Sequence, residues 1–350
     1  MGAFPFRYLG LPLFNARITQ DMYQPLLDKI KARIMNWANH SLSYAGKALL
    51  VNSVIFGLHT FWGASVLLPK GIVKRIIKLC KDFLWGIADG SRRHVFLKWQ
   101  LLCSPKLEKG GGGEIGIKEV LRWNCAQMMK RVWKFFYRPH CIWTRWISTY
   151  VLKGTSLWDA QQTVSNSWYW NNVLKMKDLL LGLAGSPDQA LHLLDACTAQ
   201  MKYSTDTMYG YIRTRRPLVP WAPLIHGTGC HPKHSFTGML VMNNELPTVD
   251  KLILRGMCFI NRCVLCECSC EDIPHLFFEC EFSKCVLIVV AQWVQMPLGS
   301  FSLAHIMQAN LPTRRNVKQH ASLLATIYYL WKERNDRIFK GSKSTVDALV

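Results

Sequence analysis

The residues best suited to chemistry in this sequence are its cysteines. Seven of the thirteen cysteines in the 350-residue chain lie within the 28 residues from 258 to 285. Four side chains of this stretch follow the order Cys-x2-Cys-x8-His-x4-Cys, namely Cys263, Cys266, His275 and Cys280. Two thiolates two residues apart can bind one metal ion from a single turn, and a distant His and Cys complete the tetrahedral shell that Zn²⁺ prefers. Because protein ligands fill all four positions and leave none for a reactive water, the spacing predicts a structural zinc site rather than a catalytic one.

The same cysteines could instead form a disulfide-bonded or merely cysteine-rich loop. The opening residues, Met1 to Arg7, are not followed by a long apolar run and do not resemble a secretion signal. We therefore expect a reducing, intracellular compartment in which thiols stay free for metal. No compact Lys/Arg-rich run is present to distinguish nucleus from cytoplasm. The exact quartet stays open, because four further cysteines could each replace a ligand: Cys258, Cys268, Cys270 and Cys285.

The charge of the chain is strongly positive and unevenly placed. The net charge is +21; residues 1–150 hold 23 Lys and Arg against 7 Asp and Glu, whereas residues 151–350 hold 20 against 15. A basic half predicts a polyanionic partner, with RNA or DNA bound non-specifically as the leading candidate and no small-molecule substrate. A membrane is the other polyanionic surface to consider, and no membrane partner is expected. The most apolar stretch, residues 54–69, is short and carries His59 and Thr60 in its middle, which favours a buried helix.

The elements that would position these residues are mainly α-helices. Apolar residues recur at helical spacing in several windows, while residues 6–14 indicate an extended segment containing Gly10 and Pro12. The last helix should stop at Gly341. The glycine-rich residues 104–117 indicate a loop, because no Gly-Lys-Ser/Thr follows them to hold a phosphate. Helices are predicted over residues 26–37, 46–61, 72–85, 123–136, 167–180, within 232–254, and over 319–339.

The helix predicted at residues 72–85 carries the clearest basic stripe. Four lysines follow an i, i+4, i+8, i+11 ladder along it: Lys70, Lys74, Lys78 and Lys81. Lysines aligned in this way can follow a phosphate backbone, and each neutralised phosphate releases condensed counterions. The alternative is an ordinary solvated helix face, and the sequence leaves both interpretations open.

Several blocks of the sequence resemble a known family. The runs FRYLGLPL, WANHSLSYAGKALLVNSV and CKDFLWG resemble the region after the polymerase core of plant non-LTR (LINE-type) retroelement reverse transcriptases. The runs PKHSF, LPTVDKL, CVLC and HLFFEC are similar to the reverse transcriptase zinc-binding domain of these elements, and WKERNDRIF is similar to how such proteins close. The blocks follow the family's order over nearly the whole chain. The resemblance implies that Cys263, Cys266, His275 and Cys280 are the metal ligands.

The resemblance also suggests a division of the chain and an ancestral role in handling element RNA or target DNA beside the polymerase. We expect a basic helical, thumb-like region at residues 1–180, a linker at 181–210, the zinc-binding domain at 211–300 and a helical tail at 301–350. The polymerase core itself is expected to be absent, as in a truncated copy. Two-metal nucleotidyl transfer needs paired carboxylates, and the chain contains no Asp-Asp pair; its adjacent acidic residues are Glu271 and Asp272, inside the cysteine stretch.

These observations predict a non-catalytic, zinc-containing nucleic-acid-binding remnant. Hydrolysis is disfavoured, because the acids are scattered and His226, His231 and His234 look like loop residues. One alternative is a zinc-stabilised protein-interaction scaffold, in which the apolar run 276–278 either meets a partner or forms the core of its own domain. A decayed copy without a selected function is a further alternative.

Overall fold

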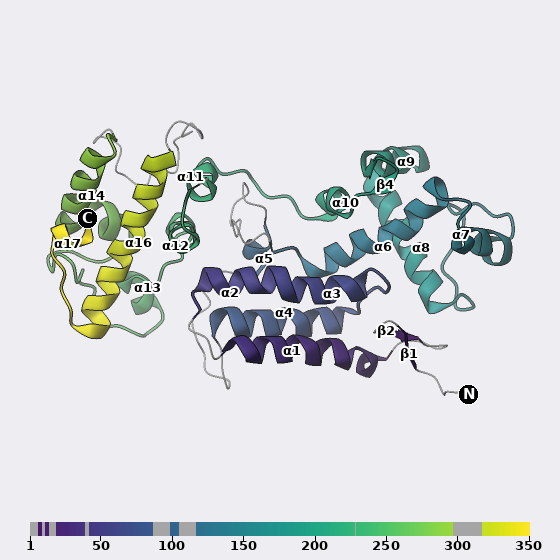
Figure 1. The fold of residues 1–350 in the computed structure, drawn as a ribbon, viewed down its shortest axis with the longest axis horizontal. Helices are drawn as coiled ribbons and strands as arrows, with labels where there is room; N and C mark the ends of the chain where they lie inside the picture. Colours follow the sequence, from purple (N-terminus) through teal and green to yellow (C-terminus); the bar gives the residue numbers. More distant parts are fainter. Residues whose placement is uncertain are drawn as a thin grey trace. The chain divides into compact units, whose positions relative to one another are not determined.

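The computed structural model describes residues 6–8, 11–13, 19–38, 42–86, 99–104, 117–227, 229–296 and 317–350. Within these ranges the chain is mainly α-helical, with two short antiparallel hairpins (Figure 1), which confirms the expected fold class. The chain forms two compact units, each assembled from three stretches of sequence. Unit 1 comprises Met1–His40, Ser53–Asp82 and Lys118–Thr214, and unit 2 comprises Ser41–Asn52, Phe83–Ile117 and Arg215–Val350.

Unit 1 begins with the hairpin of β1 and β2, in which Phe6 pairs with Leu13 across the turn. This hairpin agrees with the extended segment predicted for residues 6–14. The elements of the first part of unit 1 are β1 (Phe6–Tyr8), β2 (Leu11–Leu13), the 3₁₀ helix η1 (Gln20–Tyr23), α1 (Gln24–Ala38), α3 (Phe56–Gly63) and most of α4 (Lys70–Trp85). Its second part contains α6 (Val120–Tyr137), α7 (Ile142–Trp146), the π-helix η4 (Ile147–Leu152), α8 (Trp168–Ala184), α9 (Pro187–Ala196), β3 (Thr198–Ala199), β4 (Lys202–Tyr203) and α10 (Thr205–Ile212).

The core of unit 1 forms around α6, which contacts α3, α8 and α10. The Trp123 ring lies 5.4 Å from Phe56 and 5.5 Å from Tyr209, centroid to centroid, so that α6 joins α3 to α10. Trp123 and Trp133 of α6, which alternate with basic residues along the helix, are buried in this core. Further buried members of this core include Met128, Met129, Val132, Val173, Leu174, Leu180 and Met208.

Polar side chains of α6 complete the hydrogen bonding at the end of α3. Asn124 Nδ2 donates to the carbonyls of Gly63 (2.9 Å) and Val66 (3.0 Å), and its Oδ1 accepts from Leu68 N–H (2.6 Å). The last carbonyls of a helix have no partner within the helix, so a buried helix end needs such donors. Gly63 allows this close approach, because a Cβ there would lie 2.7 Å from Gln127 Oε1 and 2.9 Å from Asn124 Nδ2.

Residues 181–210, expected to be a linker, belong mostly to α9, the β3–β4 hairpin and α10, and they pack into unit 1. Ala190, Leu194 and Cys197 are fully buried there. Tyr203 Oη donates to the carbonyl of Ala126 at 2.6 Å, which fastens the hairpin to α6. The sequence pattern was weak because each of these short elements buries only a few residues. The four-part division of the chain as a whole stays a prediction.

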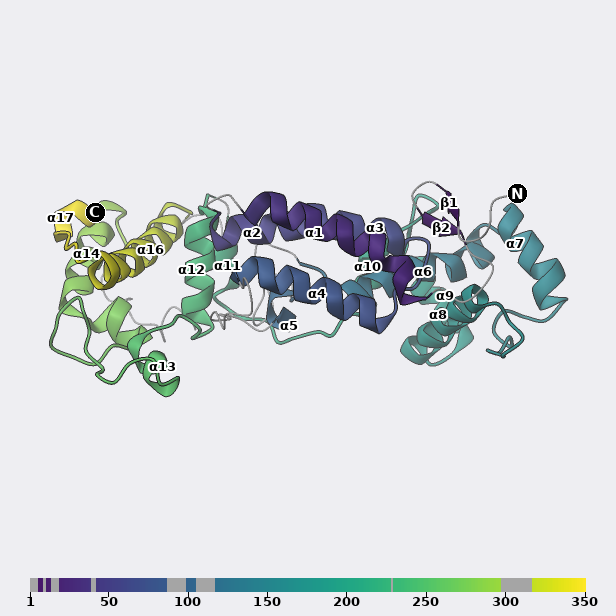
Figure 2. The same cartoon turned by 90° about the horizontal axis from the view of Figure 1, so that it is seen from below.

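Most of unit 2 comes from its third stretch, Arg215–Val350, and Figures 1 and 2 both show α14 beside α16. Its elements are α2 (Tyr44–Leu50), the end of α4, α5 (Trp99–Leu102), α11 (Ala222–His226), α12 (Pro232–Met242), α13 (Val249–Leu254), the π-helix η5 (His275–Glu279), α14 (Glu281–Trp293), α16 (Val317–Lys340) and α17 (Val346–Leu349). The π-helix η2 (Val51–Ile55) continues α2 and leads to α3.

The helix α16 is the central support of unit 2, because it contacts α11, α12 and α14. Leu323, Leu324, Ile327 and Leu330 are buried along it. The helix ends before Gly341, whose φ of +66° is a conformation that glycine adopts readily. The predicted helix within residues 232–254 is two helices, since Asn244 adopts φ +56° and Pro247 follows.

The buried-helix interpretation of residues 54–69 agrees with the structure, where most of the stretch belongs to η2 and α3 and His59 is buried. In the described ranges no helix combines the length and the apolar character needed to cross a membrane. The loop predicted at residues 104–117 falls largely outside the described residues.

Candidate metal centre and basic helix

The structure brings the four predicted metal ligands together in unit 2. One potential ligand atom from each of Cys263, Cys266, His275 and Cys280 lies within 4.8 Å of the others, and this is the one such group of His, Cys, Asp or Glu found among the described residues. Two contacts are shorter: Cys263 Sγ lies 4.0 Å from Cys280 Sγ, and Cys266 Sγ lies 3.3 Å from His275 Nε2. With Zn–S bonds of about 2.3 Å, a tetrahedral ion would separate two sulfurs by about 3.8 Å, so the donor set fits zinc in both chemistry and size.

A tight turn presents the first two ligands. Cys263 N–H donates to the Ser269 carbonyl (2.7 Å), and Glu267 N–H donates back to the Cys263 carbonyl (2.8 Å). Glu267 closes the turn with φ +58°, in the left-handed region that favours glycine. The two hydrogen bonds fold the chain back on itself, so that the thiols of Cys263 and Cys266 face the same point.

The other two predicted ligands lie at the two ends of the π-helical turn η5: His275 is its first residue, and Cys280 directly follows it. Asp272 Oδ1 accepts from His275 N–H at 2.7 Å and caps the start of this turn. Cys280 N–H donates to the His275 carbonyl (2.7 Å), and the Cys280 carbonyl accepts from Lys284 N–H (2.8 Å) as α14 begins. A turn with i→i+5 bonding brings residues five apart close together, which explains how an x4 spacing serves one metal ion.

The electrostatics of the thiols suit a metal ligand. A hydrogen bond from Cys263 lowers the pKa of Cys280 to about 5, and the same bond raises the pKa of Cys263. Of these two sulfurs, which lie 4.0 Å apart, Cys280 Sγ is therefore the one that loses its proton more easily. Metal ions bind the thiolate rather than the thiol, so this pairing favours metal binding near neutral pH.

The remaining cysteines of the stretch do not enter the group. Cys268, Cys270 and Cys285 are exposed and Cys258 is half-buried, and no disulfide bond joins any of the thirteen cysteines, all of which lie in the described ranges. The apolar run that follows His275 turns inward: Leu276 and Phe277 are fully buried and Phe278 is 4 % exposed. These three residues form the core of the domain and cannot contact a partner.

The adjacent acidic residues of the cysteine stretch, Glu271 and Asp272, accept hydrogen bonds from other groups of the protein and do not belong to the metal-binding cluster. Glu271 is fully buried and accepts from Arg334 of α16, with Nη2 at 2.7 Å and Nε at 3.1 Å from each carboxylate oxygen. Its Oε1 also accepts from Val249 N–H at 3.0 Å, at the start of α13. Sequence reasoning missed this pair, because its members lie 63 residues apart and no local pattern joins them.

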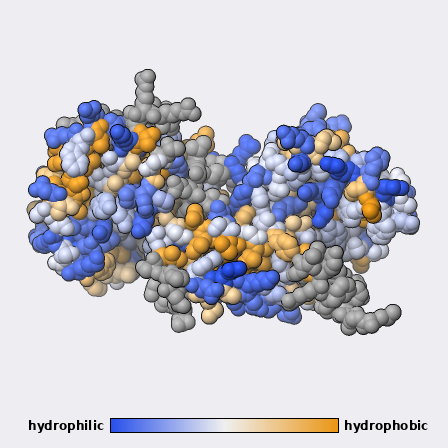
Figure 3. Space-filling model, viewed as in Figure 1, coloured by the Kyte–Doolittle hydropathy of each residue, from blue (hydrophilic) through white to orange (hydrophobic). Residues whose placement is uncertain are grey.

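The lysine ladder lies along α4 in unit 1. Lys70, Lys74 and Lys78 are exposed and Lys81 is partly exposed, and none of the described acidic groups pairs with them. Arg75 of α4 donates to Gln24 Oε1 of α1 at 3.1 Å, which places α1 alongside. In Figure 3, hydrophilic residues gather over α1, which adds three exposed basic side chains: Lys29, Lys31 and Arg33.

The histidines near α12 have structural roles. His231 Nδ1 accepts from Lys233 N–H at 3.2 Å and caps α12. The His234 ring packs 4.8 Å from the Tyr328 ring of α16, and burial, followed by the charges of His231 and Lys233, lowers its pKa. The prediction that all three histidines lie in loops is wrong for His226 and His234, which belong to α11 and α12.

Comparison with known proteins gives the family of this region. The family described as zinc-binding in reverse transcriptase matches residues 203–286, a range that contains all four clustered ligands. Residues 203–286 are thus similar to the zinc-binding domain of reverse transcriptases. The matched range begins inside unit 1, eight residues before the boundary predicted at residue 211, and includes α10.

Two plant proteins are similar to parts of the chain. A protein of Arabidopsis thaliana that is named provisionally as a ribonuclease H protein is 28 % identical over 134 residues, which are 38 % of this chain and 21 % of that protein. An uncharacterized mitochondrial protein of the same plant is 22 % identical over 113 residues, 32 % of this chain and 71 % of that protein. The chain thus spans about a fifth of the first relative. With the domain match, these similarities confirm the relation to retroelement reverse transcriptases.

Proposed function

We propose that this chain is a non-catalytic nucleic-acid-binding protein of the reverse-transcriptase kind, in which a structural zinc ion organises the zinc-binding domain. The row of exposed lysines on α4 supports nucleic-acid binding most directly. The closed set of three sulfurs and one imidazole nitrogen supports a structural metal, because four protein ligands leave no position for an activated water.

A structural zinc ion would couple metal binding to folding in this domain. The ion would be held by the four clustered side chains: Cys263, Cys266, His275 and Cys280. Between His275 and Cys280, the fully buried Leu276 and Phe277 supply only a small apolar core to stabilise the loops around the site. Small zinc domains draw much of their folding free energy from the metal, so removing it should loosen them.

Chelation followed by limited proteolysis tests the zinc proposal. After treatment with a strong chelator, we expect new cleavages within residues 230–290, while the helices α6 and α8 of unit 1 stay resistant. Added Zn²⁺ should restore the original pattern. Equal resistance of both regions with and without chelator, together with no zinc in elemental analysis, would contradict the proposal.

The nucleic-acid proposal makes a quantitative statement about salt. If about five phosphates are neutralised, the slope of log affinity against log salt should be about −4 to −5 on duplex DNA. Reversing the charge of Lys70, Lys74, Lys78 and Lys81 to Glu should abolish capture of a short duplex or a single strand and flatten the slope. A matched control reverses four exposed lysines elsewhere in unit 1, with the same change in net charge: Lys130, Lys153, Lys175 and Lys202. Equal losses in both variants would indicate net charge rather than the α4 ladder.

Protein interaction is a second candidate, and one observation favours it. The last residue of α13 and the segment after it expose four large apolar side chains: Leu254 (86 %), Met257 (66 %), Phe259 (93 %) and Ile260 (78 %). Exposed apolar clusters of this kind commonly meet partners. Replacing Phe259 and Ile260 with Ser should abolish such an interaction and leave nucleic-acid capture unchanged.

A further inference from the structure

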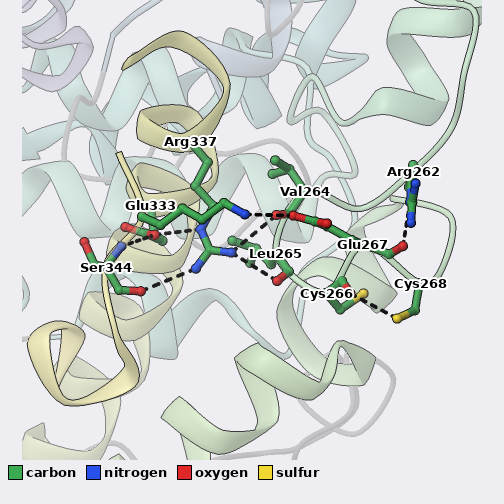
Figure 4. Close-up of polar contacts among 10 residues, drawn as sticks. Arg262, Val264, Leu265, Cys266, Glu267, Cys268, Glu333, Arg337 and Ser344 are labelled. Carbon is green, nitrogen blue, oxygen red and sulfur yellow. Dashed lines mark hydrogen bonds and ion pairs between the residues drawn. The ribbon is translucent and has the colours of Figure 1, made fainter. Parts of the chain in front are cut away.

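The turn that presents Cys263 and Cys266 is held from outside by the end of α16. Arg337 Nη1 donates to the carbonyls of Leu265 (3.1 Å) and Val264 (3.3 Å), the two residues between the ligands (Figure 4). Both of these bonds are to backbone oxygens, so the guanidinium can hold the turn without bonding to the thiols. The guanidinium carries its donors in a rigid planar fork, and a single donor group can therefore fix two adjacent peptide units.

Arg337 is itself fixed in place by its own helix and by the segment after it. Its Nε donates to Glu333 Oε1 at 2.7 Å, and the two side chains are only 7 % and 3 % exposed. Glu333 Oε1 also accepts from Ser344 N–H (2.8 Å), while Arg337 Nη2 donates to the Ser344 carbonyl (3.4 Å). Burial alone would raise the pKa of Glu333, but the bonds from Arg337 and Ser344 outweigh it and hold the pKa below its ordinary value. The carboxylate is therefore charged and keeps the guanidinium oriented.

The same region reaches the second pair of ligands. The Arg337 guanidinium carbon lies 4.6 Å from the centre of the Phe282 ring, two residues after Cys280. Lys343 Nζ donates to Glu267 Oε1 at 3.0 Å, one residue after Cys266. Residues 333–344 thus contact the chain next to three of the four ligands.

We propose that Arg337 is a positioning residue of the metal centre, and that the metal-binding module extends to residue 344, well past the matched range 203–286. The inference depends on the proposed zinc site. Groups that orient the ligands from behind lower the reorganisation needed when the metal binds, and their loss typically reduces metal affinity about 10- to 100-fold. A helix that merely covered the domain would change its stability and leave the coordination unchanged.

The test compares two variants of the full chain on the same helix. Arg337→Met keeps an apolar stem against Phe282 but removes the fork, and Lys340→Met removes an exposed charge one turn later, where Lys340 pairs with Asp336. Zinc affinity is measured by competition with a chromogenic chelator, and the visible bands of the Co²⁺-loaded protein report the geometry of the sulfur ligands. We expect Arg337→Met to bind zinc about 10- to 100-fold more weakly with altered Co²⁺–thiolate bands. Lys340→Met should match the parent in both measurements.

The Arg337→Lys variant keeps the test decisive if Arg337→Met does not fold. A lysine preserves the charge beside Glu333 but lacks the fork for two carbonyls, so its zinc affinity should fall between those of the parent and Arg337→Met. Zinc affinity and Co²⁺ bands equal to the parent in a folded Arg337 variant would overturn the inference and leave the zinc proposal intact. A parent chain that binds no zinc would overturn both.

Discussion

The buried ion pair between Glu271 and Arg334 allows a quantitative prediction about the zinc-binding domain. The two side chains are 0 % and 3 % exposed, and three donor–acceptor distances of 2.7 to 3.1 Å join them. Glu271 also accepts from Val249 N–H, so one carboxylate joins α13, the cysteine stretch and α16. The perturbation is Arg334→Met, which removes the cation and preserves most of the side-chain volume.

The expected loss in the free energy of unfolding follows from the Glu271 carboxylate, which stays buried without its partner. Removing one partner of a buried pair leaves an uncompensated charge and typically costs about 3–5 kcal/mol. Replacing both residues with Met removes the charge, and the remaining penalty is the orphaned Val249 N–H, about 1–3 kcal/mol. The double variant should therefore be more stable than Arg334→Met alone, although it carries one more substitution.

Hydrogen exchange measured by mass spectrometry can follow this domain separately from unit 1. In the zinc-loaded protein, a loss of 3–5 kcal/mol corresponds to about a hundred- to a few thousandfold faster exchange, since each 1.4 kcal/mol is tenfold. The increase should appear in peptides from residues 249–280 and 317–340. Peptides from α6 and α8 in unit 1 serve as the internal control and should exchange at the parent rate.

Two outcomes would refute this reasoning. Exchange in Arg334→Met within a few-fold of the parent would show that the buried pair contributes little to the domain. A double variant less stable than Arg334→Met would show that the carboxylate is useful without its partner, so that the penalty assigned to the orphaned charge is wrong.

Three further predictions concern unit 1 and can be measured by urea unfolding. Asn124→Leu leaves Leu68 N–H and the end of α3 without partners and should cost about 3 kcal/mol or more. Gly63→Ala places a Cβ 2.7 Å from Gln127 Oε1 and should cost about 1–3 kcal/mol. Burial lowers the pKa of His59 to about 4, so the unfolded chain binds an extra proton between pH 6.5 and 4. Stability should therefore fall by up to about 3 kcal/mol as the pH drops through this window, and His59→Leu should remove that part of the fall.

The controls for these variants lie in the same unit. Gln161→Leu changes a side-chain amide at an exposed loop position, and Gly154→Ala adds a methyl where no atom lies within 4 Å, although its φ of +90° adds strain. His192→Leu removes an exposed histidine. Unchanged stability in Asn124→Leu would mean that water replaces the three bonds, and an unchanged pH profile in His59→Leu would mean that His59 is not the titrating group.

The helices and the grouping of four potential ligand side chains could be predicted from local spacing. The pattern of Ile72, Ile76 and Leu84 fixed the buried face of α4 and therefore the exposed face that carries Lys74 and Lys78. The Cys-x2-Cys turn is a local motif, and its two partners followed within fourteen residues. A site formed by residues that lie close together in the sequence can therefore be predicted from the sequence alone.

What the sequence could not predict depends on contacts across long separations. Asn124 reads as a polar interruption of an apolar helix until the end of α3, about sixty residues away, is placed beside it. Arg337 and Glu333 have the spacing of an ordinary exposed i, i+4 pair, and only the position of the Cys263–Cys266 turn shows that they are buried. The π-helical turns η2 and η5 were missed as well, because their residues fit an α-helical pattern equally well.

Unit 2 includes two segments from the first part of the chain, and this limits how far the protein can be truncated from its N-terminus. The Tyr44 ring of α2 stacks on Phe236 of α12 at 5.9 Å, and it also lies 5.8 Å from Trp85, at the end of α4. A polypeptide that starts at residue 203 would lack both outer aromatic partners and would present the bare flank of α12 to solvent. Exposed rings of this kind promote self-association. Insolubility of such a shortened product would then reflect the missing early segments, and it would carry no information about whether the cysteines bind zinc.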